Sequence, residues 1–239
     1  MRLDKFISEI GYTRKDAEFF VKTKRITIND KIASKKDEKV DEINDTICLD
    51  GNNLKYAKYI YIMLNKPAGI LSATEDKNQK TVISLLPENL QKKGLFPVGR
   101  LDKETMGLLI LTNDGDFCHK MISPKSNIAK IYRFELADEI EEEQIKHIEQ
   151  GIELKDGYTT LPCQINMENK TSGEITITEG KYHQIRRMFG AVGNKVIYLE
   201  RIKEGNIILD KKLKRGEWRE LTKDEIDNAL KNFNKQNKY

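Results

Sequence analysis

An aspartate in a short, glycine-bounded segment is the residue of this sequence best placed to do chemistry. Asp102 lies between Gly99 and an apolar run over residues 108–111 that has the composition of a buried strand. A charged loop beside a buried strand is a common way to hold a reactive group on a rigid scaffold. Such a carboxylate can do nucleophilic or acid–base chemistry. It can equally pair with Arg100 or cap a turn, and the segment alone does not separate these roles.

The elements around Asp102 predict a mixed domain that begins at residue 59. Continuous or alternating apolar residues predict strands over residues 59–64, 108–111, 130–136, 173–178, 196–199 and 207–209. Helical spacing predicts helices over residues 81–86, 140–150, 179–189 and 222–233. The connections are mostly hairpin-like and follow no regular strand–helix–strand order. The fold class predicted is therefore α+β, with a mixed and largely antiparallel sheet.

The first residues form a separate pattern with many cations. Apolar spacing predicts a helix over residues 3–10 that ends at Gly11, and Thr13 is a plausible N-cap of a second helix. Alternating residues over 25–33 with an Asn29-Asp30 turn predict a hairpin. Residues 1–40 hold 11 Lys and Arg against 7 Asp and Glu. A basic corner of this kind suits an RNA backbone, although such runs are more often ordinary solvated faces.

Composition and motif spacing exclude several function classes. The net charge of +4 permits a nucleic-acid partner without requiring one. Cys48, Cys118 and Cys163 lie far apart, and the three histidines complete no metal signature. No glycine-rich phosphate motif occurs, so we expect neither a nucleotide cofactor nor a metal. No window approaches the ~20 apolar residues that span a bilayer, so we expect no membrane partner and a cytoplasmic location.

Four segments, in one order, resemble the motifs of the pseudouridine synthases that modify bacterial ribosomal RNA. Residues 65–69 resemble the first motif and residues 99–115 the catalytic motif. Residues 130–132 resemble the tyrosine motif and residues 179–189 the third motif.

The N-terminal residues resemble the S4 RNA-binding domain. Lys24 and Asp30 depart from it, because they stand where that family often has glycine. Residues 1–7, 50–52 and 182–184 are most similar to the branch of the synthase family that acts on the small-subunit RNA.

The resemblance implies roles for particular side chains. Asp102 is the reacting carboxylate and Arg186 its cationic partner, with Arg187 as the neighbouring alternative. Tyr132 stacks on the flipped uracil, and Ile185 packs beneath it. The RNA contacts that we expect, apart from Ile185, are cations: Arg14, Lys15, Lys22, Lys24, Arg25, Lys66, Arg100, Lys181 and Arg187.

The sequence thus predicts two domains: an S4-like RNA-binding domain over residues 1–55 and a pseudouridine synthase catalytic domain over residues 59–239. Residues 50–54 read as a turn or linker between them. The predicted partner is ribosomal RNA, 16S in a small-subunit assembly intermediate, bound by a monomer. The alternatives are a 23S enzyme of the same family, a non-catalytic ribosome-assembly protein, and a hydrolase that uses Asp102 and Glu104.

Overall fold

The computed structural model describes residues 1–42, 44–54 and 59–231. The chain divides into two compact units, Met1–Lys58 and Tyr59–Tyr239. We call them the N-terminal unit and the second unit, and each is described by itself.

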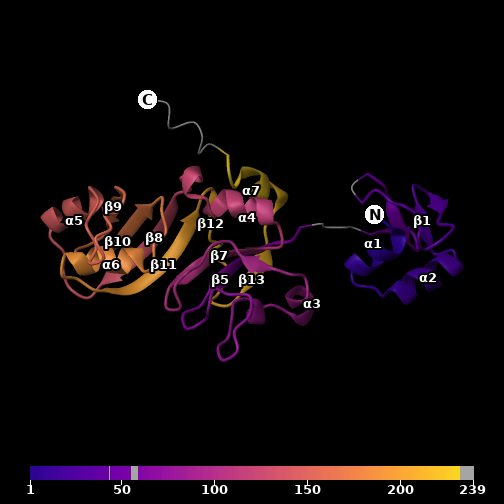
Figure 1. Cartoon of the computed structure of the whole chain (residues 1–239), viewed down its shortest axis with the longest axis horizontal. Coiled ribbons are helices and arrows are strands. Elements are labelled where there is room, and N and C mark those ends of the chain that lie inside the picture. Colours follow the sequence, from indigo (N-terminus) through magenta and orange to yellow (C-terminus); the bar gives the residue numbers. More distant parts are fainter. Residues whose placement is uncertain (43, 55–58, 232–239) are drawn as a thin grey trace. The chain divides into compact units, whose positions relative to one another are not determined.

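The N-terminal unit packs two helices against a small sheet (Figure 1). The helices are α1 (Leu3–Glu9) and α2 (Arg14–Lys22). The sheet has the order β2-β1-β3-β4, formed by β1 (Ile26–Ile28), β2 (Lys31–Ile32), β3 (Ile47–Leu49) and β4 (Asn52–Asn53). Thr13 caps α2 as predicted, because its hydroxyl accepts from the Asp16 backbone N–H.

The turns of the N-terminal unit explain its departures from the S4 pattern. Lys24, Asn29 and Asp30 all have positive φ, at 58°, 48° and 65°. Asn and Asp tolerate this conformation better than most residues, whereas Lys24 adopts it with some strain. Of the two interpretations of residues 50–54, the turn is confirmed and the linker is wrong: Asp50 and Gly51 form the tight turn between β3 and β4.

The second unit is built on one mixed sheet. Its order is β13 (Trp218–Glu220), β5 (Tyr61–Lys66), β7 (Met106–Thr112), β11 (Val196–Glu204), β8 (Lys130–Leu136), β10 (Ser172–Ile177) and β9 (Gln164–Met167). β12 (Ile207–Ile208) pairs with β11, and β6 (Phe96–Pro97) pairs with β7. Only the β7–β11 pair is parallel among the described strands. The predicted fold class is confirmed.

Helices cover both faces of this sheet. They are α3 (Glu88–Gln91), α4 (Gly115–Ile122), α5 (Glu142–Glu149), α6 (Gln184–Ala191) and α7 (Lys223–Asn228), with 3₁₀ turns η1 (Ile83–Leu85) and η2 (Pro124–Ser126). Leu109 and Leu111 of β7 join the core that contains α6, whereas Leu108 and Ile110 join the core beneath α4. Burial on both faces explains why the run 108–111 is apolar throughout.

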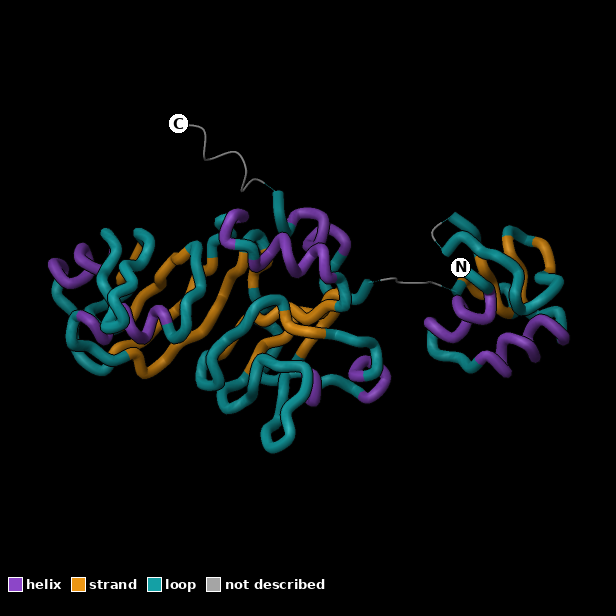
Figure 2. The backbone as a smooth tube through the Cα atoms, viewed as in Figure 1, coloured by secondary structure: helices purple, strands orange, loops and turns teal. Residues whose placement is uncertain are grey.

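The sequence pattern missed several elements and misplaced several boundaries. The elements that were not predicted are α3, α4, η2, β3, β4, β6, β9 and β13. The strand predicted over 196–199 is β11, which continues to Glu204, and the helix predicted over 222–233 is α7, which ends at Asn228; residues 232–233 lie outside the described residues. The helix predicted over 179–189 begins only at Gln184, because His183 has φ 49° and interrupts helical geometry. The long connection between β5 and β7 is mostly loop (Figure 2).

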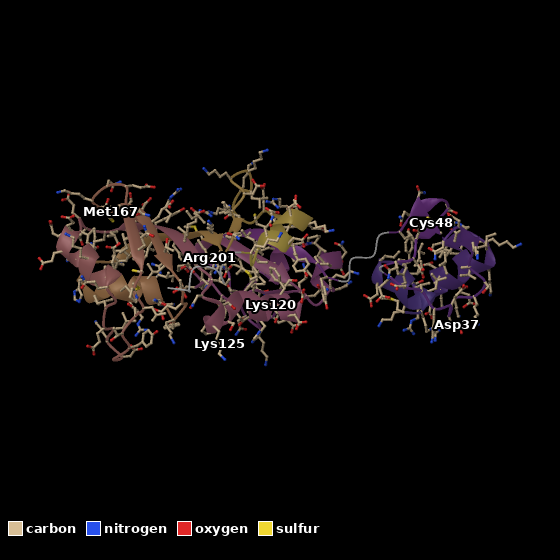
Figure 3. The ribbon with its side chains drawn as sticks, turned by 90° about the horizontal axis from the view of Figure 1, so that it is seen from above. Asp37, Cys48, Lys120, Lys125, Met167 and Arg201 are labelled. Carbon is tan, nitrogen blue, oxygen red and sulfur yellow. The ribbon has the colours of Figure 1, made fainter. Side chains whose placement is uncertain are left out.

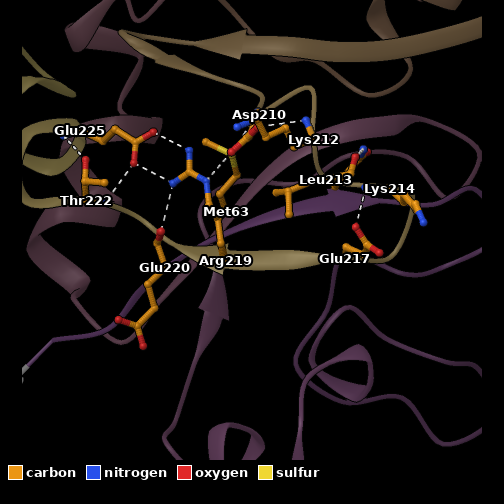
Figure 4. A network of polar contacts seen from close by, with 11 residues as sticks. Met63, Asp210, Lys212, Leu213, Lys214, Glu217, Arg219, Glu220, Thr222 and Glu225 are labelled. Carbon is orange, nitrogen blue, oxygen red and sulfur yellow. Dashed lines mark hydrogen bonds and ion pairs between the residues drawn. The ribbon is translucent and has the colours of Figure 1, made fainter.

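A polar network fastens the C-terminal segment to the sheet edge (Figure 4). Arg219 of β13 donates to Asp210 and to both carboxylate oxygens of Glu225. These carboxylates raise the pKa of the guanidinium. This network holds β13 beside β5, the strand that ends in the first motif.

Candidate active site

The segment from Gly99 to Thr105, which we call the Asp102 loop, is held by bonds to its own backbone and to the first motif region. The Ser72 hydroxyl donates to the Leu101 carbonyl at 2.8 Å and accepts from the Leu101 N–H at 3.1 Å. The Thr105 N–H closes a turn onto the Asp102 carbonyl at 3.0 Å. The backbone around the carboxylate is therefore fixed before any substrate arrives.

Lys66 is the main support of the Asp102 loop, and its prediction as an RNA contact is wrong. The residue is 0% exposed. Its ammonium donates to the carbonyls of Pro67, Asp102, Lys103 and Thr105 at 3.1, 3.2, 3.0 and 2.9 Å. Burial lowers its pKa from 10.5 to about 8. A lysine in such a position cannot reach a phosphate, because its donors already serve four backbone acceptors.

Asp102 opens onto a small cavity of about 60 Å³. Its side chain is 29% exposed. Tyr132 and Ile185 line the cavity as predicted, together with Thr105, Gln184 and Leu199. This Asp102 cavity combines one carboxylate with aromatic and aliphatic walls, which suits a flat ring placed beside a reactive oxygen.

Tyr132 stands where β8 meets β11, on the face predicted from its alternating strand. It is 7% exposed, and burial raises the pKa of its phenol. The Arg201 guanidinium faces it and opposes that rise through its charge. Arg201 pairs with Glu204 at 3.1 Å.

The sequence reasoning missed both members of this ion pair. In a regular strand, residues three apart face opposite sides. A bulge between Arg201 and Lys203 changes the register and lets the guanidinium meet Glu204. The available signal was weak: Arg201 and Glu204 are two of four charged residues, Glu200, Arg201, Lys203 and Glu204, at the end of one strand.

The third motif builds the wall opposite Asp102. The Gln184 amide donates to Glu179 at 2.6 Å and accepts from the Lys181 N–H at 2.9 Å, which ties residues 179–184 into one loop. His183 precedes α6, and its Nε2 lies 3.6 Å from Asp102 Oδ1. The motif therefore places an imidazole beside the carboxylate, a contact that the sequence reasoning did not predict.

The ion pair predicted between Asp102 and Arg186 is not formed in the described part of the chain. Arg186 Nη1 donates to the Val196 carbonyl at 2.8 Å. Ile185, Met188 and Phe189 are the α6 residues buried in the core. Arg186 is one position further round the helix from Ile185, so its side chain extends toward the start of β11. The side chain beside Asp102 is His183 instead.

Two of the predicted RNA-binding cations surround the site. Arg100 and Lys181 line the Asp102 cavity and also a second, wider cavity of about 340 Å³. Lys181 Nζ lies over the Tyr158 ring, 4.7 Å from its centroid. Arg187 lines neither cavity and pairs with Asp156 at 2.5 Å, an interaction that lowers the pKa of that carboxyl.

The cations predicted in the N-terminal unit differ in availability. Arg14, Lys15 and Lys24 are exposed. Lys22 pairs with Glu18 at 3.0 Å. Arg25 pairs with Asp50 and lies over the Phe20 ring, 5.0 Å from its centroid. The first three are therefore the freer donors for a phosphate backbone.

The described residues contain no group of three or more side chains suited to a metal ion. Within the same residues, no helix is long and apolar enough to cross a membrane.

Comparison with known proteins gives one family and full-length relatives. Residues 60–191 match the family described as RNA pseudouridylate synthase. The chain is 43% identical over 231 residues to an RNA pseudouridine synthase of Bacillus subtilis, covering 95% of this chain and 97% of that one. It is 41% identical over 236 residues to ribosomal small subunit pseudouridine synthase A of Vibrio cholerae, covering 97% and 100%. A crystal structure of a pseudouridylate synthase superposes with a TM-score of 0.69 at 36% identity, covering 96% of this chain and 99% of that one.

Proposed function

The chain belongs to the RNA pseudouridylate synthase family, and we propose that it converts one uridine of 16S ribosomal RNA to pseudouridine, with Asp102 as the reacting carboxylate. The family resemblance of the sequence is confirmed, and the chain is an isomerase that acts on RNA. The observation that carries the role of Asp102 is its placement. It is the one carboxylate among the described residues that line the Asp102 cavity, on a loop fixed by Lys66 and Ser72.

The reaction needs one carboxylate and no net change of atoms. The N1–C1′ bond of the uridine breaks, the base turns, a C5–C1′ bond forms, and the C5 proton is lost while N1 gains one. Asp102 can begin this by attack on C1′, by attack on C6 or by removal of the 2′ proton. Each route needs an ionised carboxylate in contact with the nucleoside. Glu104 does not line the Asp102 cavity, which disfavours a hydrolase with paired carboxylates.

The walls of the cavity supply binding and orientation. Tyr132 stacks on the uracil and its hydroxyl assists loss of the C5 proton, while Ile185 packs on the other side of the ring. Extrusion of the base from structured RNA costs a few kcal/mol. Arg100 and Lys181 at the cavity rim, and Arg14, Lys15 and Lys24 of the N-terminal unit, offset that cost through phosphate contacts.

The 16S target is supported by the full-length similarity to small-subunit synthases. We infer that the RNA is presented in a small-subunit assembly intermediate, where a uridine that is later buried is still accessible. We propose that the enzyme acts as a monomer, because the residues of the Asp102 cavity all lie within the second unit of one chain.

The test is Asp102→Asn, which keeps the shape of the side chain and removes its charge. Release of tritium from C5-labelled 16S transcript is expected to fall below about one percent of wild type, with RNA affinity within a few-fold. The matched control is Asp224→Asn, an exposed carboxylate distant in sequence from the site, which should keep full activity. Pseudouridine mapping in cells with and without the gene identifies the target. Activity in Asp102→Asn rejects the catalytic role, and release of free uracil by the wild type indicates a hydrolase.

A further inference from the structure

A buried ion pair in the second unit lines the wider cavity beside Tyr132. Arg201 and Glu204 are 1% and 0% exposed, and Figure 3 labels Arg201 among the packed side chains. Among the described residues, both carboxylate oxygens of Glu204 lack a hydrogen-bond donor of good geometry, and Arg201 Nη2 lacks an acceptor of good geometry. The carboxylate is therefore held mainly by charge, from the Arg201 guanidinium and from Lys130, which is opposite Glu204 on β8.

Such a pair is a poor source of fold stability. Desolvation of two charges costs several kcal/mol each, and apolar residues of similar volume are often neutral or stabilising at such places. Glu200, on the same strand, pairs with Arg215 at 2.8 Å, and this pair differs because the Arg215 side chain is 35% exposed and its charge is solvated. Fold stability is therefore a poor explanation for Glu204, and the residues that Arg201 contacts offer a better one.

Arg201 connects the pair to the active site. Its Nε donates to the Leu108 carbonyl of β7 at 2.8 Å, which fixes the guanidinium plane. Arg201 is directly opposite Tyr132 in the register of β11 and β8, both residues line the wider cavity, and the guanidinium faces the phenol. An unopposed cation at that place would favour the phenolate, and a phenolate would repel both Asp102 and the RNA backbone.

We propose that Glu204 is a positioning residue of the active site: it neutralises Arg201, holds the guanidinium against Tyr132 and keeps the phenol protonated during the reaction. The inference rests on the proposed function, because it assigns Glu204 a role in the orientation of the uracil-stacking residue.

The charged groups that face Tyr132 set the sign of the effect. Burial raises the pKa of the phenol, the charge of Arg201 lowers it, and Glu204 and Asp102 raise it. The other charged groups on the walls shared with Tyr132 are Arg100, Lys130, Glu179 and Lys181. Removal of the Glu204 charge leaves the nearest cation unopposed, so the pKa of Tyr132 must fall.

Glu204→Gln tests this with two separate readouts. Titration of ¹³Cζ-tyrosine by NMR, with Tyr132→Phe to assign the signal, is expected to give a Tyr132 pKa about 1 to 3 pH units lower than in wild type. In single-turnover assays at pH 7, the rate at saturating RNA should fall at least tenfold, with half-saturation changed less than threefold. Glu204→Asp should recover part of both effects. The matched control Glu200→Gln should leave both unchanged.

The titration does not depend on activity, so it separates this inference from the proposed function. An unchanged Tyr132 titration together with a normal rate overturns the role of Glu204. A wild type without synthase activity overturns the proposed function but leaves the titration interpretable. If Glu204→Gln does not fold, Glu204→Asp gives the test: a lowered Tyr132 pKa with a reduced rate supports the role, and wild-type values of both reject it.

Discussion

Replacement of Lys66 by methionine is expected to loosen the Asp102 loop rather than weaken RNA binding. An ammonium has three N–H donors, which serve the carbonyls of Pro67, Asp102, Lys103 and Thr105. Three charged hydrogen bonds contribute about 4.5 to 9 kcal/mol at 1.5 to 3 kcal/mol each. The lowering of the pKa of Lys66 from 10.5 to about 8 corresponds to a burial cost of about 3 kcal/mol. The net loss in Lys66→Met is therefore about 2 to 6 kcal/mol.

The measurements are thermal unfolding and single-turnover rate. For a unit of this size, a loss near 3 kcal/mol lowers Tm by about 6 to 12 °C. Displacement of Asp102 by about 1 Å costs about 100-fold in rate. The control is Lys103→Met, an exposed neighbour in the same loop, which should change neither quantity. If Lys66→Met kept wild-type Tm and rate but bound RNA less tightly, the support role would be refuted and the phosphate-contact role restored.

The same lysine predicts a pH dependence. Between about pH 8 and 10.5 the folded state has lost this proton while the unfolded state keeps it, so this group makes the free energy of unfolding rise with pH in that window. The neutral amine has one donor fewer for the loop carbonyls. We therefore expect the turnover rate to fall above about pH 8 without a loss of stability from this residue, and Lys66→Met to lack this alkaline decline in single-turnover assays.

Three further changes test other parts of the account. Arg186→Met should reduce the single-turnover rate more than Arg186→Lys does. If Arg186→Met had the same rate as the wild type, the role of Arg186 would be limited to its structural hydrogen bond with the Val196 carbonyl. Gly107→Ala should destabilise by at least about 3 kcal/mol in urea unfolding, because φ is 97° and the new Cβ would lie 2.3 Å from the Arg201 carbonyl. Deletion of residues 1–58 should leave a folded second unit whose RNA affinity depends less steeply on salt, by about 0.7 to 0.9 per lost phosphate contact. An unchanged slope would argue against an RNA-binding role for the N-terminal cations.

The local spacing of apolar and turn residues was sufficient to predict many of the strands and helices. Strand β8 matches residues 130–136 in both bounds, because Tyr132, Phe134 and Leu136 alternate with exposed residues. The hairpin of β1 and β2 follows from the Asn29-Asp30 pair, whose side chains tolerate positive φ. Strand β13 escaped prediction because its three residues, Trp-Arg-Glu, have no buried member and are fixed by pairing with β5.

The site was predicted best where a side chain lines a cavity and worst where it supports one. Asp102, Tyr132 and Ile185 meet as the motifs implied. Lys66 looked like a phosphate contact because lysine is ordinarily exposed, and only the packing of β5 against the Asp102 loop shows that it is enclosed.

For the same reason, the presence of a positive charge does not identify the side chains of this protein that can contact RNA. Lys66, Arg187 and Arg201 are cations near the site, yet each is committed to an internal partner: backbone carbonyls, Asp156 and Glu204. For Lys66 and Arg201 the partner is buried, so contact with a phosphate would leave that partner buried and unpaired. Asp156, the partner of Arg187, is exposed, so this argument does not extend to Arg187. The cations that remain for RNA are those whose side chains are open, Arg100 and Lys181 at the cavity rim and the exposed set on the N-terminal unit. Salt dependence of binding should therefore respond to Arg100→Gln and Lys181→Gln, and less to Arg187→Gln, because the Arg187 guanidinium already pairs with Asp156.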